Sequence, residues 1–195
     1  MKMKSKKKVF LTVLCAAALV VASVLGTMAY LTSQTGTVNN TFTVGKVQIT
    51  LDEAKVDTAG TPVSPAERVT ENDYKLIPGH TYTKDPTVHV DADSEESWLF
   101  VKVVDEIADI EDAKTVAVQM TEKGWTLVDG QTNVYAYKDK VTAGQDIKVF
   151  ENFKIKGDAV VADFAGKKIT VEAYAIQADG FDTAAKAWAA APTWN

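Results

Sequence analysis

The stretch Trp98-Leu99-Phe100-Val101-Lys102-Val103-Val104 has the strongest β-strand pattern in the chain. Aromatic and β-branched side chains dominate it, and these fit the pleated surface of a sheet. The stretch is apolar on both faces at its start, which is typical of a strand covered on both sides. We therefore expect residues 98–104 to form a central strand of an all-β domain.

Weaker strand patterns lie on both sides of this stretch. Alternating apolar and polar residues predict strands over residues 42–51, 145–155 and 168–176. Residues 125–137 carry Asp129-Gly130 between two short apolar segments, which is a hairpin signature. About seven short strands at this spacing predict an antiparallel β-sandwich, either jelly-roll-like or immunoglobulin-like.

The remaining segments have less regular patterns. Residues 83–90 read as a strand, and Pro86 inside it indicates an edge position. Residues 108–120 favour a helix, and Ala-rich residues 184–191 predict a second short helix. Residues 52–74 are polar and lack strong periodicity, so we expect a surface excursion or a partly disordered loop.

The first 29 residues differ from the rest of the chain. Five lysines precede an uncharged, mostly apolar run from Val9 to Leu25, and small residues follow it. A basic segment, an apolar segment and small residues at a cut site are the parts of a secretory signal. Ala29 and Thr27 predict cleavage just before Tyr30. The competing interpretation is a retained anchor, since about 20 apolar residues can span a bilayer.

The charge balance changes once this leader is set aside. The whole chain has 195 residues and a formal charge of −5, and the leader contributes five lysines and no acid, so the remainder carries −10. Such an acidic chain does not suit nucleic-acid binding, which needs clustered cations. The single cysteine, Cys15, lies in the leader, so residues 30–195 form no disulfide and no cysteine-based zinc site. We expect them to be a single secreted domain.

Few residues carry recognisable catalytic chemistry. The sequence holds no His-Glu-x-x-His zinc motif and no Gly-x-Ser-x-Gly elbow. Its two histidines, His80 and His89, lie nine residues apart, and we expect both to be ordinary surface or rim residues. We therefore predict no catalytic residue.

The best metal candidate is the acidic loop that holds Asp91, Asp93 and Glu95. Alternating carboxylates suit Ca²⁺, which prefers several oxygen ligands. The loop lacks the glycine and the distal glutamate of an EF-hand, so solvated charge on a turn is the alternative. No other cofactor is expected. The four tryptophans and six tyrosines could form a sugar-stacking face or, more often, part of a core.

Several stretches resemble the TasA/camelysin family of secreted Gram-positive proteins. The N-terminal residues 26–32, followed by 40–45, are similar to the SipW-dependent secretion signals of that family. Further similarity lies in Pro78-Gly79 and in residues 84–88, 98–103 and 173–181. The resemblance spans nearly the whole chain, and its motifs are structural rather than catalytic.

The resemblance implies a jelly-roll-like sandwich that a signal peptidase of the SipW type trims during export. Members of the family build extracellular fibres of the biofilm matrix, in which the freed N-terminal segment of one subunit completes a sheet of the next. Residues 30–43 would then be the donated arm, with Tyr30, Leu31, Phe42 and Val44 as assembly residues. The alternative is a disordered N-terminal segment.

The leading hypothesis is therefore a secreted, non-enzymatic matrix or cell-surface protein that associates with itself. It would contact the membrane only through an uncleaved leader and would bind no nucleic acid. Two other functions stay open. One is a camelysin-like secreted metalloendopeptidase, for which His80 and His89 are the imidazoles present. The other is a cell-wall glycan-binding module that uses Trp98, Trp125 or Trp188.

Overall fold

The computed structural model describes residues 45–191. The predicted leader, its cut site at Ala29 and Tyr30, and the assembly residues Leu31, Phe42 and Val44 lie outside the described residues. Among the residues that are described, no helix is long and apolar enough to cross a membrane.

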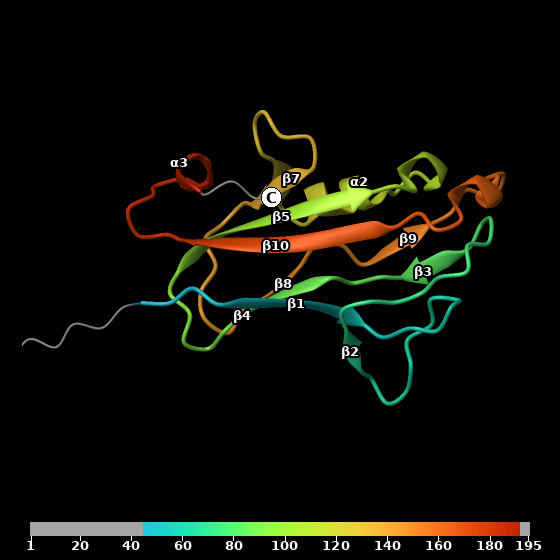
Figure 1. Cartoon of the computed structure of the whole chain (residues 1–195), viewed down its shortest axis with the longest axis horizontal. Coiled ribbons are helices and arrows are strands. Elements are labelled where there is room, and N and C mark those ends of the chain that lie inside the picture. The colour runs from blue at the N-terminus through green and yellow to red at the C-terminus, as the bar shows by residue number, and fades with distance from the viewer. Residues whose placement is uncertain (1–44, 192–195) are drawn as a thin grey trace, which may run out of the picture. The chain divides into compact units, whose positions relative to one another are not determined.

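Two antiparallel sheets of four strands each dominate the structure (Figure 1). The first has the order β2-β1-β4-β8, and the second has the order β10-β5-β7-β6. The strands of the first sheet are β1 (Ile49–Ala54), β2 (Arg68–Val69), β4 (Thr87–Val90) and β8 (Asp146–Lys148). Those of the second are β5 (Ser97–Asp105), β6 (Trp125–Leu127), β7 (Val134–Tyr137) and β10 (Ile169–Gln177).

The other elements are short. Strands β3 (Thr81–Thr83) and β9 (Asn152–Lys154) form a separate two-stranded sheet. Two α-helices, α2 (Val116–Glu122) and α3 (Ala184–Ala190), and two 3₁₀ turns, Ala108–Ile110 and Val161–Phe164, complete the described chain. The all-β prediction is confirmed at this level.

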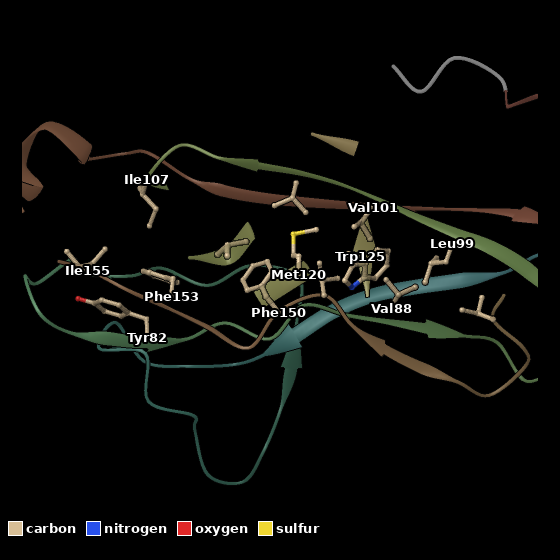
Figure 2. Packing of buried hydrophobic residues seen from close by; sticks show 14 of the residues in the cluster. Tyr82, Val88, Leu99, Val101, Ile107, Met120, Trp125, Phe150, Phe153 and Ile155 are labelled. Carbon is tan, nitrogen blue, oxygen red and sulfur yellow. The ribbon is translucent and has the colours of Figure 1, made fainter. Parts of the chain in front are cut away.

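The main core lies between the two large sheets (Figure 2). Val88 on β4 belongs to the same buried cluster as Leu99 and Val101 on β5, and Trp125 and Phe150 fill it from the loops and edges around them. Each such side chain contributes roughly 1.5–3 kcal/mol by leaving water. The shared cluster is what holds the sheets face to face.

Strand β5 is central, as the sequence predicts. It pairs with β10 along its whole length, from Ser97 opposite Gln177 to Asp105 opposite Ile169, and with β7 on its other side. Its first five residues are all buried. They are covered on both faces because a second cluster, around Trp98 and Phe100, packs beneath α3.

Three further predictions agree with the structure. Strands β6 and β7 pair antiparallel around the turn at Gly130, which has a φ of 74° and so suits glycine. Residues 169–177 form a strand, and residues 184–190 form a helix that begins at the cap Thr183.

Two strand predictions were wrong in their extent. Residues 83–90 are not one edge strand, because Asp85 and Pro86 separate β3 from β4 and β4 lies inside its sheet. Pro86 lies just before β4, so its missing N–H removes no hydrogen bond between strands. Its carbonyl accepts a hydrogen bond from the Val149 amide at 2.8 Å. Residues 145–155 likewise form two strands, β8 and β9, in different sheets.

The single helix predicted over residues 108–120 is also wrong in its extent. A 3₁₀ turn occupies Ala108–Ile110, and α2 begins only at Val116, after the cap Thr115. The Thr115 side chain accepts from the Val118 amide, as a helix N-cap does. The chain between the two elements is extended at Glu111, which bridges to Ile155, so one continuous helix is excluded.

Residues 52–74 form an ordered excursion over the first sheet. The segment starts within β1 and returns as β2. The amide of Asn72 donates to the Glu53 carboxylate and to the Ala54 carbonyl, both at 2.9 Å, which ties the end of the excursion to β1. A second contact lies at β2, where Arg68 Nε donates a hydrogen bond to Asp52 Oδ1 of β1 at 2.6 Å.

A buried ion pair also fixes strand β1, through its residue Glu53. Lys84 Nζ lies 2.6 Å from Glu53 Oε2, and both side chains are at most a tenth exposed. The ammonium also lies over the Tyr74 ring, at 5.8 Å from its centroid. Removing one partner of a buried pair leaves an uncompensated charge, and this costs far more than the pair itself contributes.

Lys84→Ala should therefore lower the free energy of unfolding by about 3–5 kcal/mol, because Glu53 stays buried without its partner. The matched control is Lys55→Ala, which breaks the Lys55–Glu67 pair of the same 2.6 Å length but with both side chains about half exposed. The control should cost less than about 1 kcal/mol. Urea denaturation measures both, and equal losses would contradict the account.

Candidate functional site: an open sheet edge beside an apolar groove

Strand β10 is a long strand at the edge of its sheet. Within residues 45–191 it pairs with β5 on one side and with no strand on the other. The other three edge strands have two or three residues each, whereas β10 has nine. Short edges limit unwanted pairing, and a long edge presents a row of free backbone groups. The open edge of β10 is therefore a place where another strand can add.

The side chains of β10 suit a covered strand better than an exposed one. Its sequence is Ile-Thr-Val-Glu-Ala-Tyr-Ala-Ile-Gln, and Ile169, Val171, Ala173 and Ala175 pack on the main core. Yet each of these four is only partly buried, while the neighbouring β5 is almost fully buried. The core is thus incomplete along the outer side of β10.

A groove of about 830 Å³ opens beside the start of β10. Its lining is mixed: apolar side chains such as Leu51, Phe164 and Val171 alternate with charged ones, among them Glu71, Lys84 and Lys167. Strand β1 forms the opposite wall, and β2 pairs with it only at Glu53 and Ala54, so the outer edge of residues 49–52 has no strand partner among the described residues. The groove is therefore lined by residues of β1 and β10, one strand from each large sheet.

The described chain enters the domain at the opposite end of β10. Gly45 lines a second, polar hollow of about 600 Å³ together with Gln177, the last residue of β10. The carboxylates of Glu95, Glu96 and Asp182 line it as well. Charged side chains therefore line both ends of the open edge, together with apolar ones at the Ile169 end.

Residues 45–48 are fixed at that end by the loop that follows β4. Lys46 Nζ lies 2.6 Å from Asp93 Oδ2, and the Glu95 amide donates to the Lys46 carbonyl at 2.9 Å. The Gln48 amide donates to Ser94 Oγ at 3.1 Å. The acidic loop therefore holds Lys46 and Gln48 at the start of the described chain.

This finding bears on the calcium candidates Asp91, Asp93 and Glu95. The Lys46 ammonium forms an ion pair with the Asp93 carboxylate, and the hydrogen bond between them lowers the pKa of Asp93. No group of three or more histidine, cysteine or acidic side chains is placed to hold a metal ion among the residues described. The contact that the structure shows for Asp93 is its ion pair with Lys46.

The two histidines lie in separate environments. His80 Nε2 lies 2.8 Å from the Ala59 carbonyl. His89 on β4 bridges two carboxylates on the outer face of the first sheet, Asp52 at 2.9 Å and Asp146 at 2.6 Å. The hydrogen bond to Asp52 is the largest of the effects that raise the pKa of His89. Both ring nitrogens of His89 are therefore engaged.

Of the three tryptophans considered as a sugar platform, two are buried and Trp188 is partly buried. Trp98 and Trp125 are buried, and their indole N–H groups donate to the carbonyls of Phe181 and Lys148. Trp188 packs against Phe100 with ring centroids 5.1 Å apart. These aromatic rings fill the cores on the two faces of the second sheet.

One buried group was not indicated by any sequence pattern. Glu111 is 2% exposed; its Oε2 accepts from the Val116 amide at 2.9 Å, and its Oε1 finds no donor among the described residues. Burial, followed by the negative charge of Asp105, raises the pKa of Glu111 to about 8. A proton held between Glu111 and Asp105 satisfies the free oxygen, so the two carboxyls act as an acid–carboxylate pair.

Glu111→Gln should make the protein more resistant to alkaline pH. The folded-state pKa of Glu111 is raised above its unfolded value of about 4.3. Its ionisation therefore favours the unfolded state as pH rises above that value, and the loss is complete above about pH 8. Glutamine keeps a donor for Asp105 and an acceptor for the Val116 amide.

Denaturation at pH 5.5 and pH 9 measures this effect. The wild type should lose more than about 1.4 kcal/mol relative to the Gln variant, the value of one pKa unit. The control, Asp158→Asn on the surface, changes the net charge equally and should follow the wild type. Parallel pH profiles for wild type and Glu111→Gln would rule out the shared proton.

The described part of the chain thus offers backbone pairing and apolar contact at β10. The sequence predicted the strand itself but not its exposed edge, because the partner of each strand depends on the whole topology. A nine-residue apolar strand with no proline or inward charge was the available signal. No protein-family model, characterised protein or solved structure matches this chain.

Proposed function

We propose that this protein is a secreted, non-enzymatic subunit that assembles with copies of itself by strand donation. Residues 30–44, here called the arm, would add to the open edge of β10 in a neighbouring copy. The observation that carries the proposal is the nine-residue strand β10 with one edge unpaired among the described residues, beside a groove of mixed polarity. Addition of an extended segment to an exposed edge is a common mode of recognition.

The energetics favour a long arm. Each backbone hydrogen bond contributes a net 0.5–1.5 kcal/mol or so, and several would form along β10. Ordering the arm costs about 1–2 kcal/mol per residue, so backbone pairing alone does not suffice. Burial of apolar arm side chains against the partly exposed residues of β10 supplies the remainder at about 25 cal/mol per Å².

The sequence of the arm is consistent with this role. From residue 38 onward its even-numbered positions are apolar except for Asn40, and its odd-numbered positions from 33 to 43 are all Ser, Thr or Asn. Such alternation gives an extended segment one apolar and one polar face. The apolar face would lie on the core, and the polar face would meet solvent.

Export and location follow from the leader in this proposal. Cleavage before Tyr30 by a signal peptidase of the SipW type would free the arm outside the cell. The resemblance to TasA-type subunits supports extracellular matrix fibres as the product and a jelly-roll-like topology for the two sheets. A cysteine-free domain with a charge of −10 suits a soluble subunit outside the cell.

Val171→Lys should weaken the assembly of protein that begins at Tyr30. An inward-pointing lysine at an open edge opposes strand addition, and Val171 lines the groove. The matched control is Thr126→Lys, which adds the same charge at an exposed position of β6, the strand at the opposite edge of the same sheet. Sedimentation velocity over a concentration series should show polymers for wild type and control. The critical concentration of Val171→Lys should rise at least about tenfold, or 1.4 kcal/mol.

Thermal unfolding checks that both variants are folded. A peptide of residues 30–44 added in excess gives an independent readout, because it should occupy β10 and stop elongation of the wild type. A wild type that stays monomeric at all concentrations, or polymers that are indifferent to both Val171→Lys and the peptide, would refute strand donation.

A further inference from the structure

We propose that Lys84 and Asn72 become joined by an isopeptide bond, an amide between their side chains, with Glu53 carrying the protons. The observation behind this proposal is that one buried carboxyl group holds both partners. Lys84 Nζ lies 2.6 Å from Glu53 Oε2, and Asn72 Nδ2 donates a hydrogen bond to Glu53 Oε1 at 2.9 Å. The proposal does not depend on strand donation. It gives a domain without cysteine a covalent cross-link of another kind.

Three segments of the chain bring these side chains together. Glu53 lies on β1, Asn72 lies near the end of the excursion that returns through β2, and Lys84 follows β3. The Asn72 amide is held from two sides, because Nδ2 also donates to the Ala54 carbonyl at 2.9 Å and Oδ1 accepts from the Val56 amide at 3.0 Å. A backbone carbonyl only accepts and a backbone N–H only donates, so the amide nitrogen must face Glu53.

The site is largely shielded from water. Glu53 is 4% exposed and Lys84 is 8% exposed, and the centroid of the Tyr74 ring lies 5.8 Å from the Lys84 nitrogen. Burial disfavours the charged forms of an amine and of a carboxyl group. Transfer of a proton from Nζ to Oε2 along their short hydrogen bond then gives a neutral amine and a neutral acid. A neutral amine is the nucleophile that attack on an amide requires.

The reaction needs no co-reactant. The lone pair of Lys84 Nζ attacks Asn72 Cγ, and the Val56 N–H stabilises the negative charge that develops on Oδ1. Glu53 gives its proton to Nδ2, with which it is already hydrogen-bonded, and takes a proton from Nζ. The Cγ–Nδ2 bond breaks and the Cγ–Nζ bond remains as an amide. Ammonia takes the last proton from Glu53 and leaves as ammonium, so Glu53 ends as the carboxylate it was.

Approach and exit are both available in this place. Attack requires Nζ to come within about 3–3.5 Å of Cγ. Both partners already contact the same carboxyl group, and rotation about the last bonds of the flexible lysine side chain moves Nζ along it. Glu53, Asn72 and Lys84 all line the groove of about 830 Å³, which gives ammonia a way out. The nucleophile, the electrophile, the proton carrier and the exit thus lie together.

The bond would close a loop over residues 72–84. A cross-link of this kind acts mainly by constraining the unfolded chain, as a disulfide does. It would keep the end of the excursion beside the segment between β3 and β4, although β2 pairs with β1 at only two positions. Unlike a disulfide, an amide is not broken by reductants. The cross-link therefore suits a domain that must stay folded without cysteine.

Intact-mass spectrometry of the purified full chain tests the bond. The measured mass should lie below the mass calculated from the sequence, counted from the measured N-terminus, by one ammonia molecule. Glu53→Gln removes the proton carrier and Lys84→Arg removes the nucleophile, so both variants should have their full calculated mass. The matched control is Lys55→Arg at the exposed pair with Glu67, and this variant should keep the deficit.

Peptide mapping shows where the ammonia was lost. Trypsin does not cut after a lysine whose side chain is in an amide bond, so the peptide of residues 69–75 should be recovered joined to an uncut peptide of residues 76–102. A deficit confined to residues 69–75 would mean that Asn72 has closed a ring on its own backbone, and it would overturn the inference. A wild type with its full calculated mass would overturn it as well. Neither result affects strand donation, which the sedimentation experiments test separately.

Discussion

The burial of β5 on both faces is the constraint on which the rest of the structure depends. Its first five residues are buried, with Leu99 and Val101 in the core shared with the first sheet and Trp98 and Phe100 in the cluster beneath α3. A strand of this kind must have neighbours on both sides. Strand β7 provides one, and β10 provides the other over the full length of nine residues. Because β10 covers one side of β5, β10 itself becomes the edge strand of the sheet.

The incomplete edge links the fold to the function that we propose. Most edge strands in the described chain are too short to attract a partner, but β10 must be long because it matches β5 residue by residue. The lack of a cover leaves Ile169 and Val171 partly exposed beside the groove. Addition of an arm would complete the core along that side, so assembly and folding would draw on the same apolar contacts.

Local pattern predicted the elements whose environment is local. Strand β5, the hairpin around Gly130 and helix α3 all follow from propensity, turn residues or caps. The position of β4 inside its sheet could not be predicted, because Pro86 signals an edge only if it lies within the ladder. The split of residues 145–155 between two sheets also depends on distant partners. The burial of the Lys84 ammonium and of the Glu111 carboxyl depends on packing that no local pattern encodes. Of the site, the sequence indicated the strand β10; it offered the loop at Asp93 either as a calcium candidate or as solvated charge, and it did not indicate that Lys46 pairs with Asp93.

The central claim is that the free edge of β10 is where one copy receives another. Amide hydrogen exchange, measured on monomeric and on assembled protein beginning at Tyr30, tests it directly because exchange reports which backbone N–H groups are hydrogen-bonded. The account predicts that alternate amides of residues 169–177 exchange rapidly in the monomer and become strongly protected on assembly, together with the amides of residues 36–44. Equal protection of β10 in both states, or new protection confined to other strands, would contradict it.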